Sequence, residues 1–298
     1  MSTRQPVIEG LTAATVGVTD FGPHLDFFCG QLGYAQAGNG VVPAATTAAL
    51  WGADNEPGPG EAEVVVLSAA GAGTGRINLV RVPGAEVADW PHNLDDGLIG
   101  IDMYARDIVA AHAAMAAAGT PWHRPPATYG VPFGERTVEV TQGVCPGPGG
   151  VVTVFVQPAA VRDTAAWAAD PSRMFTELTS VVCHVPDPDG EVRLWGPDGL
   201  GMSVWYDVTF TAPGFDEVAD LPPGTRMRLA FLAGPATARI EVTCAEGPHR
   251  ADLRPRQRPG RGLGHCGWSV RTGDLDEALR RAAQAGARHV GEAVRTDD

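Results

Sequence analysis

The chain has 298 residues, of which 44% are hydrophobic and 19% charged, as is typical of a soluble globular protein. Its formal net charge of −13 argues against nucleic-acid binding, because neutralising phosphates requires a basic surface. The sequence contains no apolar signal core and no run of about 18 apolar residues. We therefore expect a cytoplasmic protein that binds neither nucleic acid nor membrane.

The first half contains two units with the same order of predicted elements. In residues 7–84 the pattern predicts a strand, a helix and three strands, at 11–19, 22–32, 40–42, 63–68 and 76–82. In residues 96–158 the same order recurs at 98–105, 108–118, 127–129, 136–142 and 151–157. Residues 159–174 have little strand character and are interpreted as a linker.

The second half repeats the order once in full and once in part. Residues 175–247 contain predicted strands at 178–185, 202–211, 225–232 and 238–245, with a helix at 191–200. A basic loop, 250–261, leads to the last unit, 262–298. That unit has a strand at 265–270, a helix at 276–284 and one further strand at 288–294, so two strands are missing from it.

Each unit begins with a strand, an Asp and a helix that ends at a Gly. The Asp residues, Asp20, Asp107, Asp187 and Asp274, stand where a helix N-cap is expected. The terminal glycines, Gly33, Gly119, Gly201 and Gly286, are separated by 86, 82 and 85 residues. Spacing this regular indicates an internal fourfold repeat.

Five cysteines, an odd number without CxxC spacing, are distributed along the chain: Cys29, Cys145, Cys183, Cys244 and Cys266. Three of them fall in predicted strands, where a buried free thiol is the ordinary state. This pattern predicts free thiols in a reducing compartment.

Alternation along the four leading strands separates an apolar face from a face of small and polar residues. The polar face includes Asp102, Tyr104, His184 and His265 and suits the wall of a cavity. On a later strand of the third unit, Glu241 stands between Ile240 and Val242 and should face the same side. A buried acid is costly unless it is paired or bound to a metal.

The tandem order of strand, helix and three strands resembles the vicinal oxygen chelate superfamily, which includes glyoxalases, bleomycin-resistance proteins and extradiol dioxygenases. The local match is closest from Val16 through Asp20 and Phe28 to Gly33 and Tyr34. The resemblance implies an α+β fold in which βαβββ modules pair into cup-shaped mixed sheets. We expect two such halves, residues 7–158 and 175–298, with the fourth module incomplete.

In that superfamily a divalent metal is held by residues of the first strand and the last strand of each module. The corresponding positions here are Ala13, Gly100, Ser180, His265, Asn78, Thr153 and Glu241. Only His265 and Glu241 match in residue type, and His184 could complete a two-histidine, one-carboxylate set for Fe, Mn, Ni or Zn. The alternative is that Glu241 pairs with Arg228 or Arg239 and that His265 is a hydrogen-bonded histidine without metal.

The resemblance implies a small-molecule enzyme, a lyase, isomerase, cyclase or dioxygenase that acts on an oxygenated metabolite of an aromatic or polyketide-like kind. Without a metal, Asp102, Tyr104 or His184 would act as the catalytic acid or base. The competing hypothesis is a protein that sequesters an antibiotic or similar compound without converting it. A third is that the first half is purely structural. A monomer and a homodimer are both compatible with the sequence.

Overall fold

The four leading strands are the framework of the computed structural model, which describes residues 6–51, 60–82, 91–160, 162–236, 238–247 and 249–287. They are β1 (Ile8–Val18), β5 (Gly97–Ala105), β9 (Phe175–His184) and β13 (Gly264–Thr272). The predicted last strand, 288–294, lies outside the described residues.

The first two units contain the predicted strands and one additional helix. In the first unit α1 (Phe21–Leu25) continues as the π-helix η1 (Asp26–Gln31), and then come β2 (Tyr34–Val42), α2 (Ala44–Trp51), β3 (Ala62–Ala69) and β4 (Arg76–Arg81). The second continues with α3 (Ile108–Ala117), β6 (Ala127–Phe133), β7 (Arg136–Pro146), the 3-10 turn η2 (Pro148–Gly150) and β8 (Val152–Gln157). Helix α2 was not predicted, and β2 is longer than expected.

The third and fourth units follow the short helix α4 (Ala165–Ala169), which lies in the predicted linker. The third contains α5 (Pro188–Trp195), β10 (Ser203–Phe210), α6 (Pro213–Val218), β11 (Arg226–Ala233) and β12 (Arg239–Glu246). In the fourth, β13 leads to α7 (Leu275–Gln284). None of the helices in the described ranges could span a membrane.

The repeated Asp and Gly have the predicted roles in all four units. The carboxylates of Asp20, Asp107, Asp187 and Asp274 each accept a hydrogen bond from a backbone N–H in the first helical turn. The closing glycines, Gly33, Gly119, Gly201 and Gly286, have φ values of 73°, 83°, 93° and 98°. This left-handed conformation is strained for other residues, which explains the recurrence of Gly.

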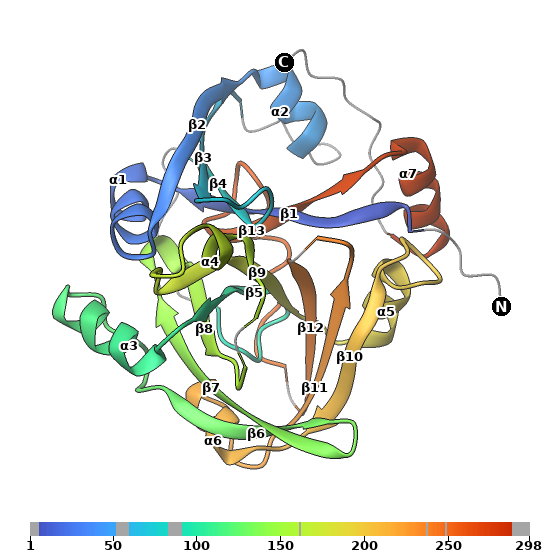
Figure 1. The fold of residues 1–298 in the computed structure, drawn as a ribbon. Coiled ribbons are helices and arrows are strands. Elements are labelled where there is room, and N and C mark those ends of the chain that lie inside the picture. Colours follow the sequence, from blue (N-terminus) through green and yellow to red (C-terminus); the bar gives the residue numbers. More distant parts are fainter. Residues whose placement is uncertain are drawn as a thin grey trace.

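The sheets join different units from those that the sequence led us to pair. β1 pairs with β13, which gives a five-stranded sheet of order β13-β1-β4-β3-β2 (Figure 1). β5 pairs with β9, which gives an eight-stranded sheet of order β10-β11-β12-β9-β5-β8-β7-β6. The halves expected at residues 7–158 and 175–298 therefore share both sheets. All four leading strands offer equivalent edges, so the sequence pattern alone does not select the partner.

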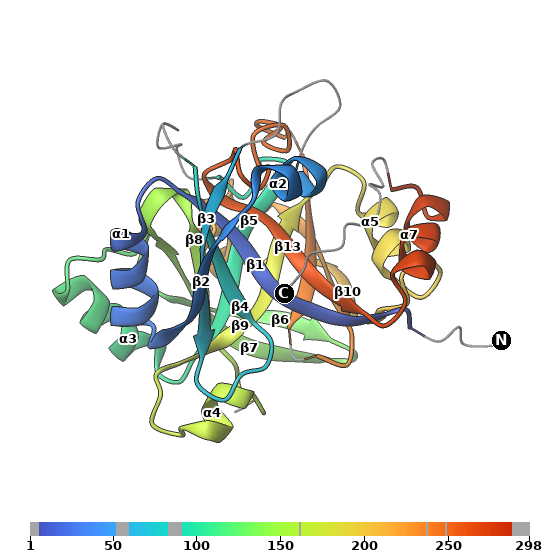
Figure 2. The same cartoon turned by 90° about the horizontal axis from the view of Figure 1, so that it is seen from above.

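The eight-stranded sheet curls into a nearly closed barrel. Its edge strands β6 and β10 approach each other, and the Tyr206 hydroxyl donates a hydrogen bond to the Pro132 carbonyl across the gap, at 2.6 Å. From above, β1 and β13 run side by side across the barrel (Figure 2). This barrel encloses the inner faces of the second and third units.

The main core lies between the two sheets. It contains the predicted apolar face of the leading strands, including Val16, Ile101, Met103 and Val181, none of which is exposed. A second cluster, with Tyr129, Val154 and Phe210, lies inside the barrel and packs against Phe215 of α6. All five cysteines are free, as predicted.

Candidate active site

Two carboxyl groups meet on the inner face of the barrel. Asp102 of β5 and Glu241 of β12 are within hydrogen-bonding contact, and Ser180 of β9 donates its hydroxyl to Asp102 Oδ2 at 2.9 Å. Burial raises the pKa of Asp102 to about 6, although the bonds from Glu241 and Ser180 oppose the shift. Burial and the Asp102 charge raise the pKa of Glu241 well above its usual value. Two such acids share a proton near neutral pH.

A guanidinium group lies next to the acid pair. Arg239, two residues before Glu241 on β12, lowers the pKa of both carboxyls by its charge. Its Nη1 donates a hydrogen bond to the Tyr104 hydroxyl at 3.1 Å. The structure therefore brings together Asp102, Tyr104 and Glu241 of the predicted site residues. Of the two arginines considered as partners of Glu241, Arg239 acts on it by charge alone, and Arg228 pairs with Asp189 and Asp207 instead.

Solvent reaches Glu241, although it lies in the middle of its strand. Its neighbours Ile240 and Val242 are fully buried on the core side, whereas Glu241 is partly exposed on the inner side. Asp102 is 6% exposed. The acid pair is thus largely buried, and its small contact with solvent is on the inner side of the barrel, through Glu241.

Apolar residues form the inner surface below the acid pair. Burial, together with the charges of Glu241 and Asp102, raises the pKa of Tyr129 well above its usual value. The Tyr129 hydroxyl donates to Gln142 Oε1 and stays a neutral donor. A small molecule that entered the barrel would meet polar groups first and an apolar floor beneath them.

His265 is not part of this arrangement. It lies on β13 of the five-stranded sheet, is 3% exposed and has a pKa lowered by burial to about 4. A register shift between Thr15 and Val16 pairs His265 with Val16, which belongs to the core. Such a bulge turns the following side chain to the other face, here the core side. The predicted convergence of His265 and Glu241 does not occur, because β13 and β12 belong to different sheets.

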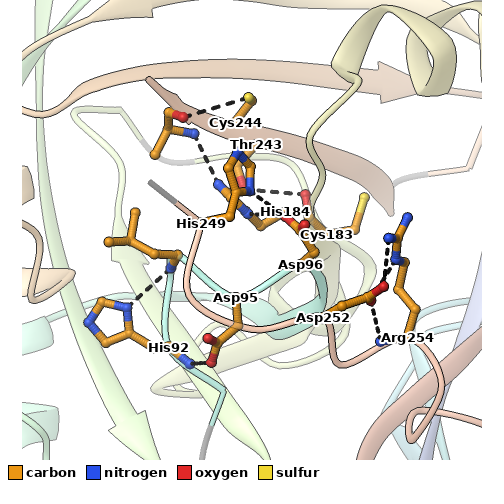
Figure 3. A network of polar contacts seen from close by, with 12 residues as sticks. His92, Asp95, Asp96, Cys183, His184, Thr243, Cys244, His249, Asp252 and Arg254 are labelled. Atoms are coloured by element: carbon orange, nitrogen blue, oxygen red, sulfur yellow. Dashed lines mark hydrogen bonds and ion pairs between the residues drawn. The ribbon is translucent and has the colours of Figure 1, made fainter. Parts of the chain in front are cut away.

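His184 lies at the opposite end of the barrel, with two residues that the sequence did not single out (Figure 3). Its Nδ1 is 3.2 Å from Asp96 Oδ1, and His249 Nδ1 is 2.6 Å from the same oxygen. Asp96 and His184 are buried, and His249 is partly exposed. Within the described ranges these three form the one group of side chains composed like a metal site.

The hydrogen bonds of His184 determine its tautomer and whether its nitrogens are available to a metal. The backbone N–H of Ala245 donates to His184 Nε2 at 3.0 Å, so this nitrogen presents its lone pair to the amide. The Nδ1 of neutral His184 must then carry the hydrogen and donate it to Asp96. A metal would require Nδ1 to lose that hydrogen. The donor types fit a transition metal, but the hydrogen bonds occupy His184.

The same cluster fixes the basic loop to the barrel. Asp96 N donates to the Ala251 carbonyl at 2.7 Å, and Leu253 N donates to the Asp96 carbonyl at 2.8 Å. The Gln257 amide bonds both the N–H and the carbonyl of Leu98, each at 2.7 Å. No pattern in the sequence indicated these contacts, because His249 and Asp96 are 153 residues apart and lie in loops.

The five-stranded sheet has a hollow of about 520 Å³ on its own outer face. Ala13 and Asn78, the ligand positions of the first unit, line it together with Ser269, Arg76 and Arg271. The described lining residues include no carboxyl or imidazole group. Among its described lining residues, this hollow thus has no acid–base pair like that of the barrel.

No protein-family model and no curated protein matches the sequence. Among solved structures, glyoxalase I from Zea mays superposes with a TM-score of 0.61 over 96% of this chain and 83% of that chain, at 15% identity. The chain has the glyoxalase fold. A putative dioxygenase from Bacillus subtilis matches with a TM-score of 0.58 at 12% identity, covering 95% of this chain and 77% of that chain. The predicted resemblance to the superfamily is thus confirmed at the level of this glyoxalase fold.

Proposed function

We propose that this protein is an enzyme that moves protons on a small oxygenated molecule bound inside the eight-stranded barrel. The observation that carries the proposal is the Asp102–Glu241 pair, two buried carboxyls in hydrogen-bonding contact whose pKa values are both raised by burial. Two carboxyls that share a proton suit general acid and base roles. Isomerase, lyase or cyclase chemistry fits this arrangement.

In the proposed mechanism Asp102 is the base and Glu241 the acid. With a pKa of about 6, Asp102 is mostly ionised at pH 7, while Glu241 holds the shared proton. Asp102 accepts a proton from a carbon next to a carbonyl group, and Glu241 donates its proton to the carbonyl oxygen. In a conjugated enol, Asp102 then gives its proton to another carbon while Glu241 takes back the hydroxyl proton, so that both carboxyls return to their starting states. If the enol is released instead, the proton passes from Asp102 to Glu241 through their hydrogen bond.

The neighbouring side chains hold these two acids in their roles. Ser180 donates to Asp102 Oδ2 and fixes its orientation. The guanidinium of Arg239, which donates to the Tyr104 hydroxyl, supplies positive charge where negative charge develops on the substrate. Removal of the Ser180 hydroxyl is expected to weaken catalysis more than binding.

The superfamily resemblance implies a divalent metal, but the predicted ligand set of His265, Glu241 and His184 does not fit one. His265 lies on another sheet, and His184 hydrogen-bonds Asp96 and Ala245. The positive charge that faces Glu241 and Asp102 comes from Arg239. In the proposed mechanism the guanidinium of Arg239 takes the place of a metal as the source of positive charge.

Sequestration without conversion is the second candidate, since the ligand positions Ala13, Asn78, Gly100 and Thr153 carry no acid or imidazole.

Solvent deuterium exchange distinguishes proton transfer from sequestration. Benzoylacetate and related aryl ketones are incubated in D₂O with the protein, and mass spectrometry follows deuterium next to the carbonyl. We expect exchange above the buffer rate, lost in Asp102→Asn and Glu241→Gln and kept in the surface control Arg226→Gln. Tight binding without exchange would favour sequestration.

A further inference from the structure

Aromatic side chains gather at the end of the barrel where Tyr104 and Arg239 lie. Phe133 at the end of β6 stacks on Tyr206 with ring centroids 6.0 Å apart, and Trp205 lies 5.9 Å from Phe133 and 5.8 Å from Phe231. Phe133 is 43% exposed and Trp205 39%. Large apolar side chains that gather on a surface commonly mark a binding site.

The strand pairing connects this aromatic cluster to the acid pair. Glu241 is paired with Phe231 on β11, and Phe231 is paired with Tyr206 on β10, so the three side chains form one row across the inner face. Trp205 is the additional residue at a register shift between Val204 and Tyr206. A bulge at this point re-aims its side chain relative to the regular alternation.

Two cations lie against the same indole. The Arg239 guanidinium carbon is 4.6 Å from the Trp205 ring centroid, and that of Arg162 is 5.7 Å away. The acid pair with its shared proton carries about one negative charge, and two guanidinium groups stand beside Trp205 on the same side. Two cations gathered at one place in a protein of net charge −13 favour an anionic ligand.

We propose that the substrate is an aromatic acid, a compound with an aromatic ring and an ionised carboxylate or phenolate. The ring lies among Phe133, Trp205 and Phe231, and the anionic oxygen is bound by Arg239 with Arg162 beside it. Its reactive carbon then lies toward Asp102 and Glu241. This assignment rests on the proposed function for the location of the reacting groups, but the binding that it predicts can be measured separately.

Binding of 2-naphthoate, measured by isothermal titration calorimetry, tests the proposal. We expect 2-naphthoate to bind at least tenfold more tightly than cyclohexanecarboxylate, whose ring is saturated, and than 2-naphthalenemethanol, which lacks the charge. Arg239→Gln and Trp205→Leu should each weaken 2-naphthoate at least tenfold. Arg226→Gln, a matched loss of an exposed arginine, should change it less than twofold.

Several outcomes would overturn the assignment. Equal binding of all three probes, or loss of affinity in Arg226→Gln alone, would remove the aromatic acid. A dimer that dissociates in Trp205→Leu, seen by sedimentation, would show that the aromatic cluster is an interface between two copies. Asp102→Asn separates the two proposals, since it should abolish deuterium exchange and keep 2-naphthoate binding within about threefold. Deuterium exchange without binding of 2-naphthoate would contradict only the aromatic-acid ligand. Binding of 2-naphthoate without deuterium exchange would contradict only the catalytic role of the acid pair.

Discussion

The two ends of β5 carry carboxylates in opposite circumstances. Asp96, just before the strand, accepts hydrogen bonds from two imidazole groups, His184 and His249. Asp102, further along the strand, faces a second acid, and its pKa is raised to about 6. Hydrogen bonds from the imidazole groups compensate the burial of the Asp96 carboxylate, whereas the two carboxyls at the second end repel each other and are incompletely compensated. The uncompensated end therefore costs stability, as the residues of active sites commonly do.

The largest expected effect tests the compensated end. Asp96→Ala removes the acceptor of both imidazole groups and leaves the buried His184 Nδ1–H unpaired. We expect a loss of about 3 kcal/mol or more in the free energy of unfolding, measured by urea denaturation. The matched control Asp252→Ala, which removes an exposed partner of Arg254, should cost less than about 1 kcal/mol. Equal losses in the two variants would contradict the comparison.

His265, which is buried and has no carboxylate partner among the described residues, makes the free energy of unfolding depend on pH. The pKa of His265 is about 4 when folded and 6.5 when unfolded, so the unfolded chain binds the proton more readily. The stabilisation by neutral His265 is complete above pH 6.5 and lost as the pH falls toward 4, by about 3 kcal/mol in total. Between pH 7 and pH 4 the wild type should therefore lose about 3 kcal/mol more free energy of unfolding than His265→Asn. Parallel pH profiles would contradict this.

Much of the fold could be predicted because local chemistry fixes it. The N-cap Asp and the left-handed Gly of each unit act within one helix, and they occurred at all four predicted sites, as with Asp274 and Gly286. The choice of partner strand is not local. β1 meets β13 across 257 residues, as in the bond from the Thr12 hydroxyl to the Ser269 carbonyl, and no single-sequence pattern encodes that pairing.

At the uncompensated end, the raised pKa of Asp102 lowers the free energy of unfolding at high pH. Asp102 has a higher pKa folded than unfolded, so the folded state holds the proton more tightly and loses stability as the pH rises from about 4 to 6. Asp102→Asn removes this penalty. We expect it to be about 1–3 kcal/mol more stable than the wild type at pH 8, and the difference to vanish near pH 4. Urea denaturation at both pH values measures it, with Asp207→Asn as a surface control; destabilisation at pH 8 would contradict it.

The sequence indicated the acid pair only in part. Alternation placed Asp102, Tyr104 and Glu241 on the inner face because the strands there are regular. It failed for His265, where one additional residue in β13 reverses the alternation. It also could not find Asp96 and His249, which meet through a loop. Sequence patterns thus predicted which face a residue occupies and missed what irregular backbone brings together.

The smallest expected effect is the response to metal, and it tests whether hydrogen bonds or coordination hold the compensated end together. Because the Ala245 N–H engages His184 Nε2, we expect zinc to bind weakly. A tenfold excess of zinc over protein should then raise the free energy of unfolding by about 0.4 kcal/mol or less. Elemental analysis of protein purified without chelator should find well below one equivalent. About one equivalent that disappears in His249→Ala would make Asp96, His184 and His249 a metal centre. An equivalent that disappears instead in Glu241→Ala would assign a metal to the acid pair, and proton transfer between two carboxyls would give way to chelation.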